Sequence, residues 1–196
     1  LGHDGDKAIW TYFQQHWAPW FPGLGDRSTF VRQAANLWLV KQLLHERLVM
    51  DLGARTADSH ILDGFPIAIC KLARAPSSRV LRAEAAYGYC AAKREYYYGL
   101  KGHLLIDLRG VAVGMTLTAA NVDERDAAYD LLQAIEGIVL GDKGYIRPQF
   151  KADCAALGID LQTPVRLNMK ESRPRWWLKL LQRVRKRVET VISQFE

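Results

Sequence analysis

Three acidic residues, Asp63, Asp142 and Glu189, stand at positions from which carboxylates could act together, although they lie far apart in the sequence. Phosphoryl transfer by two divalent ions needs such a set, because carboxylates from several elements must converge where the ions sit ~4 Å apart. One ion activates the attacking water or 3′-hydroxyl, and the other stabilises the leaving oxygen. Mg²⁺ prefers carboxylate and water oxygens, so this chemistry requires neither histidine nor cysteine.

Asp63 falls inside an apolar segment, directly after Leu62 and before Gly64. An aspartate within an apolar strand is costly unless it is paired or binds a metal ion. It could also face outward or cap a turn. Both interpretations stay open for this residue alone.

Asp142 directly follows the apolar residues 138–140 and Gly141, at the expected carboxyl end of a buried strand. Open α/β sheets bind their ligands at that end of their strands. Gly141 and Gly144 permit a tight exit turn and a close approach of the backbone to a phosphate. A strand-end aspartate can instead be only a helix cap.

Glu189 lies in a helical pattern near the end of the sequence. At ~100° per residue it projects at the border of the apolar stripe, with Arg185 one turn earlier on the same side. From there a carboxylate can reach the end of a sheet, but an ordinary Arg185–Glu189 surface pair is the alternative. Glu196 lies on the same flank and is the reserve candidate.

The elements that must position these acids are read from apolar periodicity and turn residues. Strands are expected at 61–69, 98–107, 111–119, 138–140 and 159–164. Helices are expected at 28–49 (capped by Ser28), 126–135 (capped by Asp126), 147–157 and 174–195. An antiparallel start followed by alternating helices and parallel strands predicts a mixed α/β fold, in which residues 1–58 form an N-terminal helical segment and residues 59–196 the catalytic domain.

Composition favours a globular nucleic-acid-binding protein. The 196 residues are 49% hydrophobic and 24% charged with a net charge of +6, and no apolar run approaches the ~20 residues of a membrane span. The segment 166–187 holds nine basic residues and one acid. Such a block suits a polyanion, because each phosphate contact releases counterions, although a solvated helix face would look the same. Three cysteines without zinc spacing indicate reduced thiols of a cytoplasmic protein.

A basic and aromatic connection occupies residues 70–97, with five tyrosines between 87 and 98. Aromatic rings among cations can stack unpaired bases while the cations hold phosphates, but some of these rings could equally belong to the core.

Several stretches resemble the DDE transposases of bacterial insertion sequences, nearest to insertion sequence family 982 within the group related to families 4 and 5. The stretches are ILDGFPIAICK (61–71), AYGYCAAKREYYYGLKGHLL (86–105), LTAANVDERD (117–126), GDKGY (141–145) and RKRVETVISQF (185–195). The first acid of that family lies in a D-x-x-P strand, the second in G-D-K-G-Y and the third in an R-x-x-x-E helix. These motifs map to Asp63, Asp142 and Glu189. Gln182 stands where the wider group often has tyrosine, so that tyrosine has no counterpart here.

The resemblance implies a ribonuclease-H-like core with a five-stranded mixed sheet, two Mg²⁺ or Mn²⁺ ions held by the three acids, and action as a homodimer or larger assembly on double-stranded DNA. It implies hydrolysis at each element end and strand transfer of the freed 3′-hydroxyl to target DNA, in the bacterial cytoplasm and on the nucleoid, with N-terminal helices gripping the ends. Basic residues on the last helix, beside Asp142 and in the 70–97 connection are the expected DNA contacts: Arg185, Lys143, Lys101, Arg183, Lys186, Arg187, Arg79, Arg82, Lys93 and Arg94.

Two other functions fit the same residues. A structure-specific nuclease of the same fold, such as a junction resolvase, would cut DNA without joining it. A truncated, inactive remnant would only bind DNA, and a sequence that begins at Leu1 and ends within a helical pattern is expected to be a piece of a longer protein.

Overall fold

The computed structural model describes residues 5–91, 93–166 and 169–194. The chain forms two compact units, Leu1–Leu48 and Val49–Glu196. Within the described residues, no helix has the length and apolar character needed to cross a membrane.

The first unit is helical. It contains α1 (Asp6–His16), the short 3₁₀ helix η1 (Ala18–Trp20), α2 (Arg27–Asn36) and most of α3 (Trp38–Asp51). The prediction of one helix over 28–49 is therefore wrong, because α2 ends with Leu37 as its C-cap. Asp26 caps α2 in place of Ser28, since its carboxylate accepts a hydrogen bond from the Thr29 N–H at 2.8 Å.

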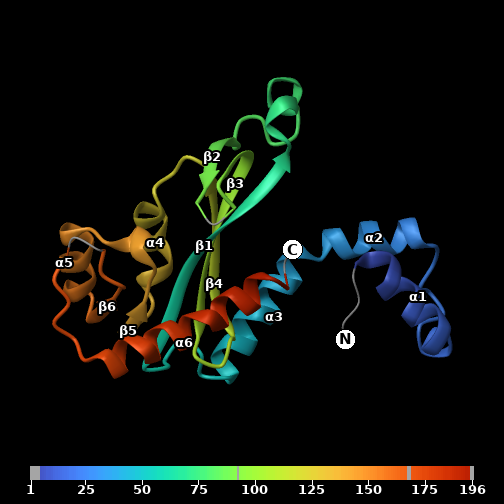
Figure 1. Ribbon diagram of the computed structural model, residues 1–196. Coiled ribbons are helices and arrows are strands. Elements are labelled where there is room, and N and C mark those ends of the chain that lie inside the picture. Colours follow the sequence, from blue (N-terminus) through green and yellow to red (C-terminus); the bar gives the residue numbers. More distant parts are fainter. Residues whose placement is uncertain (1–4, 92, 167–168, 195–196) are drawn as a thin grey trace. The chain divides into compact units, whose positions relative to one another are not determined.

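The second unit is built on one mixed sheet (Figure 1). Its strands are β1 (Ser59–Cys70), β2 (Ala86–Cys90), β3 (Glu95–Asp107), β4 (Ala112–Ala119), β5 (Gly137–Leu140) and β6 (Ile159–Gln162). β3 pairs antiparallel with β1 on one side and with both β2 and β4 on the other, while β5 pairs parallel with β1 and β6 parallel with β5. The order β4-β3-β1-β5-β6 is that of a ribonuclease-H-like sheet, so this prediction is confirmed. β2 is a sixth strand that the sequence did not predict.

Side-chain alternation along the strands creates two apolar layers. Neighbouring residues such as Ile61 and Leu62 point to opposite faces, because successive side chains alternate in a strand. Leu62 packs under α4 (Glu124–Leu132) and α5 (Pro148–Ala156), while Ile61 packs under α6 (Arg175–Ile192). The centre of the sheet is thus covered on both faces, and β5 lies between the two layers, whereas β6 is buried on one face only, with Asp160 exposed.

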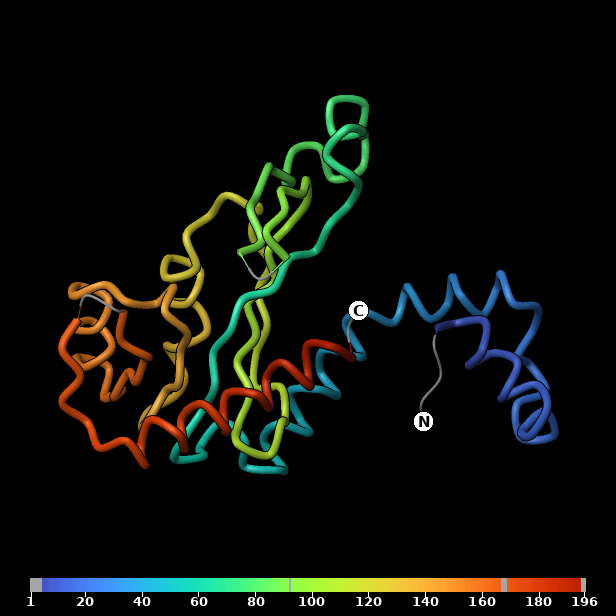
Figure 2. The backbone as a smooth tube through the Cα atoms, in the orientation of Figure 1, coloured from blue at the N-terminus to red at the C-terminus, as the bar shows by residue number. Residues whose placement is uncertain are grey.

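The long strands carry an extension of the sheet, which we call the arm and define as residues 67–99. Figures 1 and 2 show the ends of β1 and β3 continuing past the other strands to η2 (Leu72–Ser77) and β2. Part of the connection expected at 70–97 is therefore regular structure. Gly99 is fixed by close packing there, since a Cβ at this position would lie 2.1 Å from the carbonyl oxygen of Ile67.

The start of α4 differs from the prediction. The helix begins at Glu124, and its N-cap is Asp123, whose carboxylate accepts a hydrogen bond from the Arg125 N–H at 2.9 Å. Asp126, the predicted cap, lies inside the first turn and pairs with Arg147 at 3.0 Å. This shift places Glu124 at the first position of the helix, next to the carboxyl ends of the central strands.

Candidate active site

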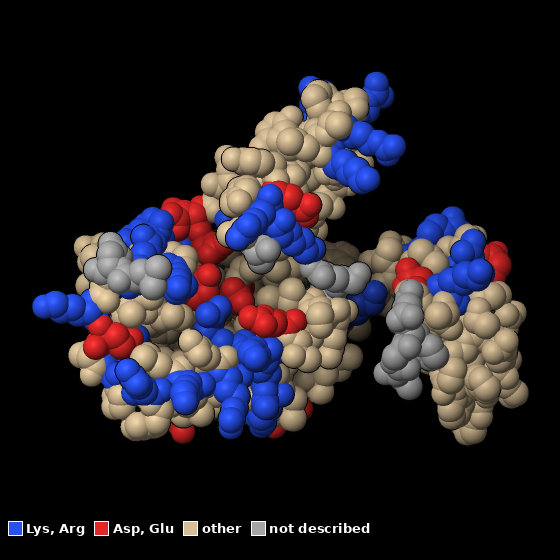
Figure 3. Space-filling model, viewed as in Figure 1, with Lys and Arg blue, Asp and Glu red and all other residues tan. Residues whose placement is uncertain are grey.

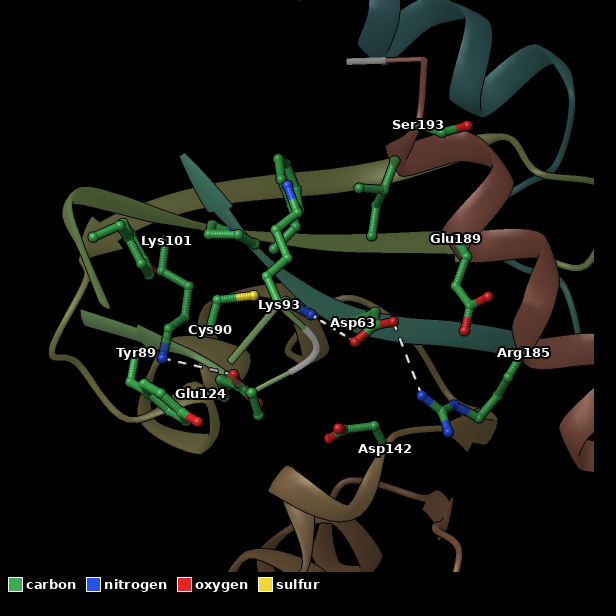
Figure 4. A pocket seen from close by; sticks show the side chains of 16 residues that line it. Asp63, Tyr89, Cys90, Lys93, Lys101, Glu124, Asp142, Arg185, Glu189 and Ser193 are labelled. Carbon is green, nitrogen blue, oxygen red and sulfur yellow. Dashed lines mark hydrogen bonds and ion pairs between the residues drawn. The ribbon is translucent and has the colours of Figure 1, made fainter. Parts of the chain in front are cut away.

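A pocket of about 460 Å³ opens where β1, the end of β5, the start of α4 and α6 meet. Its lining includes all three predicted acids together with a fourth, Glu124. Figure 4 shows Asp63 near the centre, Glu189 on the α6 side and Glu124 opposite, with Asp142 approaching from the end of β5. The fold thus brings the predicted acids to one pocket.

Asp63 is on the central strand β1 and is mostly buried, with 16% of its side chain exposed. Its Oδ1 accepts a hydrogen bond from the Gly64 N–H at 2.9 Å, and its Oδ2 lies 4.0 Å from Arg185 Nη2. Asp63 therefore faces the pocket and is neither an outward-facing nor a turn-capping residue.

Asp142 lies two residues after the last residue of β5, where it both caps a short helix and lines the pocket. Its Oδ1 accepts a hydrogen bond from the Gly144 N–H at 2.6 Å and so caps the 3₁₀ helix η3 (Lys143–Tyr145). The cap occupies one carboxylate oxygen only, and the residue also lines the pocket. The cap and the pocket position, which the sequence left as alternatives, are both present.

Glu189 lies on an exposed part of α6 next to Val188, which is fully buried against the sheet. Arg185 reaches Asp63, and no ion pair joins it to Glu189 among the described residues. The surface pair considered from the sequence is therefore not formed. Glu196, the reserve acid, lies outside the described residues.

Glu124 is the pocket acid that sequence reasoning missed. Its Oε1 lies 3.6 Å from Lys101 Nζ, and a Cβ added to Gly144 would lie 2.5 Å from its Oε2 and 2.8 Å from Asp142 Oδ1. The only available signal was its place in LTAANVDERD, just after an expected strand. Because the helix was predicted to begin at Asp126, Glu124 was not recognised as part of its first turn.

The pocket destabilises negative charge on Asp63 and Glu124. Burial raises the pKa of Asp63 to about 6, and the charges of Asp142 and Glu124 add to the rise while Arg185 opposes it. Burial and the charge of Asp142 likewise raise the pKa of Glu124, against the effect of Lys101. A cation bound among these carboxylates would relieve their repulsion.

The donor set fits Mg²⁺ or Mn²⁺, since every pocket acid offers carboxylate oxygens. Within the described residues, no group of three or more His, Cys, Asp or Glu side chains is arranged to surround a single ion. Mg²⁺ does not require such a cage, because it is usually bound by one or two carboxylates together with water and substrate phosphates. Pairs of acids from this pocket meet that requirement.

The predicted DNA contacts fall into two groups. Lys101, Lys93 and Arg185 line the pocket. The others are exposed on η3, α6 or the arm: Lys143, Arg183, Lys186, Arg187, Arg79, Arg82 and Arg94. Figure 3 shows cations along α6 and on the arm, with acidic side chains gathered in the hollow between them. Arg187 also donates a hydrogen bond to the Leu108 carbonyl, which holds part of its side chain against the protein.

No curated protein sequence matches the chain. A solved structure that resembles it is the cryo-EM structure of a piggyBac transposase synaptic complex with hairpin DNA, at 13% identity and a TM-score of 0.38, over 61% of this chain and 27% of that one. The family model described as "Transposase DDE domain" matches residues 53–196, which include every pocket acid. The chain belongs to the transposase DDE domain family.

Proposed function

We propose that this chain is the catalytic part of a DNA transposase, in which Asp63, Asp142 and Glu189 hold two Mg²⁺ or Mn²⁺ ions. The enzyme hydrolyses a phosphodiester bond at each element end and then joins the freed 3′-hydroxyl to target DNA. The observation that carries the proposal is the convergence of these acids, from β1, the end of β5 and α6, on one pocket.

The chain's own residues would share the work within this pocket. The bound ions supply the Lewis acidity that activates the attacking oxygen and stabilises the leaving one. Asp63 and Asp142 fix their positions from the sheet, and Glu189 completes the set from α6. Arg185, 4.0 Å from Asp63, adds positive charge where the scissile phosphate would lie.

DNA would be held by the cations on either side of the acidic hollow. Arg183, Lys186 and Arg187 on α6 and Arg79, Arg82 and Arg94 on the arm would contact phosphates without reading sequence. Lys143, Lys93 and Lys101 would approach the phosphate nearest the acids. The hollow itself excludes DNA until its negative charge is neutralised, so the bound ions also serve substrate binding.

The wider assignment rests on the motif resemblance. We place the chain with bacterial insertion sequence family 982, acting in the cytoplasm on the nucleoid as a homodimer or larger assembly. The division into a helical segment (1–58) and a catalytic domain (59–196) goes with this assignment, and the helical segment would grip the element ends.

The test measures DNA cleavage and joining by the full chain with Mg²⁺ or Mn²⁺. Substrates are duplexes that carry the terminal sequence of the encoding element, either intact or precleaved to expose the 3′-hydroxyl, with a plasmid as target. Asp63→Asn, Asp142→Asn and Glu189→Gln are each expected to reduce both reactions by roughly a hundred-fold or more, because each removes a charge that positions an ion. Asp130→Asn, an exposed acid-to-amide change on α4, is the matched control and should retain full activity.

The outcomes separate the proposal from its rivals. Cleavage without joining of precleaved ends would identify a structure-specific nuclease. DNA binding without cleavage under any metal condition would identify an inactive remnant. Parent-like cleavage by both aspartate variants would show that the carboxylate assignment is wrong.

A further inference from the structure

Glu124 lies between the two segments that carry the strand aspartates. A Cβ at Gly64, next to Asp63, would be 3.4 Å from Glu124 Oε1. A Cβ at Gly144, two residues after Asp142, would be 2.5 Å from Glu124 Oε2. A side chain at Gly144 would displace this carboxylate, whereas Gly64 lies in ordinary contact with it, so Glu124 is packed closely against both segments.

Glu124 is not the residue that caps α4. Asp123 provides the N-cap of α4, and its carboxylate pairs with Arg125 and, at 3.0 Å, with Arg147. Glu124 instead turns into the pocket, where only 28% of its side chain is exposed. Its position is therefore unexplained by helix capping.

Lys101 is the cation that faces Glu124. Its Nζ lies 3.6 Å from Glu124 Oε1 and donates a hydrogen bond to the Val122 carbonyl at 3.1 Å. The lysine comes from β3, where it pairs with Pro66 of β1, and 17% of its side chain is exposed. The separation from Glu124 is long for a charge-assisted hydrogen bond, so the pair can separate when another cation arrives.

A buried hydroxyl beside these acids lacks a partner. Tyr145 is fully buried, and within the described part of the chain its hydroxyl has no hydrogen-bond partner. The negative charges that act on this hydroxyl are those of Glu124, Asp63 and Asp142. A buried hydroxyl without an acceptor is costly, so a shift of the nearby carboxylates that supplied one would be favourable.

We propose that Glu124, next to Asp142, is a fourth acidic ligand of the divalent ions. In the absence of an ion, the Lys101 ammonium group lies beside the Glu124 carboxylate, and the ion displaces it on binding. The inference rests on the proposed function of the same pocket. The released lysine is then free to contact the substrate phosphate, and a small shift of the carboxylates gives the Tyr145 hydroxyl an acceptor. Two carboxylates per ion match the way Mg²⁺ is bound in proteins.

The experiment measures Mn²⁺ affinity of the DNA-free chain by electron paramagnetic resonance and calorimetry, so that activity is not the only readout. Glu124→Gln keeps the shape of the side chain and is expected to weaken Mn²⁺ binding roughly ten-fold or more, since it removes a charged ligand. Asp130→Asn on the same helix is the matched control and should bind Mn²⁺ as the parent does. Circular dichroism establishes that each variant is folded.

Lys101→Met tests the displaced cation separately. Removing a positive charge that competes for the same carboxylate should strengthen Mn²⁺ binding about three- to ten-fold. Lys151→Met, an exposed lysine on α5, changes net charge equally and should leave affinity unchanged. An unchanged or weaker affinity for Lys101→Met would show that the lysine is only structural, which overturns its assigned role.

A comparison with Asp142→Asn separates this inference from the proposed function. If Asp142→Asn loses Mn²⁺ affinity while Glu124→Gln binds like the parent, Glu124 is not a ligand and the proposed function stands. If neither variant changes the affinity, both the fourth ligand and the carboxylate site are refuted. Loss of affinity in both variants supports both.

Discussion

Replacing Asp63 by asparagine should stabilise the protein in the absence of metal ions. A pKa of about 6, against an ordinary value of 3.8, means that the folded state binds the proton more tightly than the unfolded chain does. The free-energy difference at pH 7.5 is roughly 3 kcal/mol, and partial solvent access reduces the expected gain to about 1–3 kcal/mol. Asparagine keeps an oxygen that can accept the Gly64 N–H bond now made at 2.9 Å.

The sign of the pH dependence provides the sharper test. The parent loses stability as pH rises from 3.8 through about 6, because its carboxyl must ionise in the pocket, whereas the asparagine variant has no such loss. Urea unfolding in EDTA, followed by circular dichroism from pH 4 to 8, should therefore show a stability difference that grows with pH. Added Mg²⁺ should stabilise the parent more than the variant. A variant less stable than the parent at pH 7.5 in EDTA, with equal m-values, would refute the reasoning.

Three further outcomes follow from burial and charge. His103 is fully buried, and burial lowers its pKa to about 4. As pH falls from 6.5 to 4, the free energy of unfolding of the parent should therefore decrease by about 2–3 kcal/mol relative to that of His103→Gln, measured by urea unfolding in EDTA. Phe150→Ala should lower the free energy of unfolding by about 3–5 kcal/mol, since the ring is fully buried against α4; a thermal melt would contradict this if its midpoint were unchanged. Replacing exposed Arg183 and Lys186 together by glutamine should reduce the slope of log affinity against log salt for duplex DNA by about 2, and an unchanged slope would exclude them as phosphate contacts.

Local signals predicted most of the sheet, and the misses have local causes as well. The short strand β5 is a brief apolar run next to glycine, and β6 alternates apolar and polar residues after Gly158, so each has a local strand signal. β2 was missed because AYGYC looks like part of a basic aromatic connection, and its strand character comes from pairing with β3. The break between α2 and α3 was missed because apolar spacing continues through Leu37.

From the sequence, the position of the candidate site could be predicted more readily than the full set of its acids. Asp63 and Asp142 stood out because each is an acid inside or directly after an apolar strand. Glu124 gave no such signal, since a glutamate in the first turn of a helix is ordinary. Its carboxylate lies against Gly64 and Gly144, which come from different parts of the chain and meet only in the folded structure.

The two strand aspartates show how a structural role and the proposed metal-binding role can reside in one side chain. Asp63 Oδ1 accepts the Gly64 N–H, and Asp142 Oδ1 accepts the Gly144 N–H, so a backbone donor fixes one oxygen of each carboxylate. That bond also orients the second oxygen, which in Asp63 lies 4.0 Å from a guanidinium. Among the described residues, none donates such a bond to Glu189, and its position follows from the packing of Val188, its neighbour on α6, against the sheet. The sheet therefore presets two acids by hydrogen bonds, while the third depends on how α6 is seated, and this difference explains why the helix acid is the exposed one.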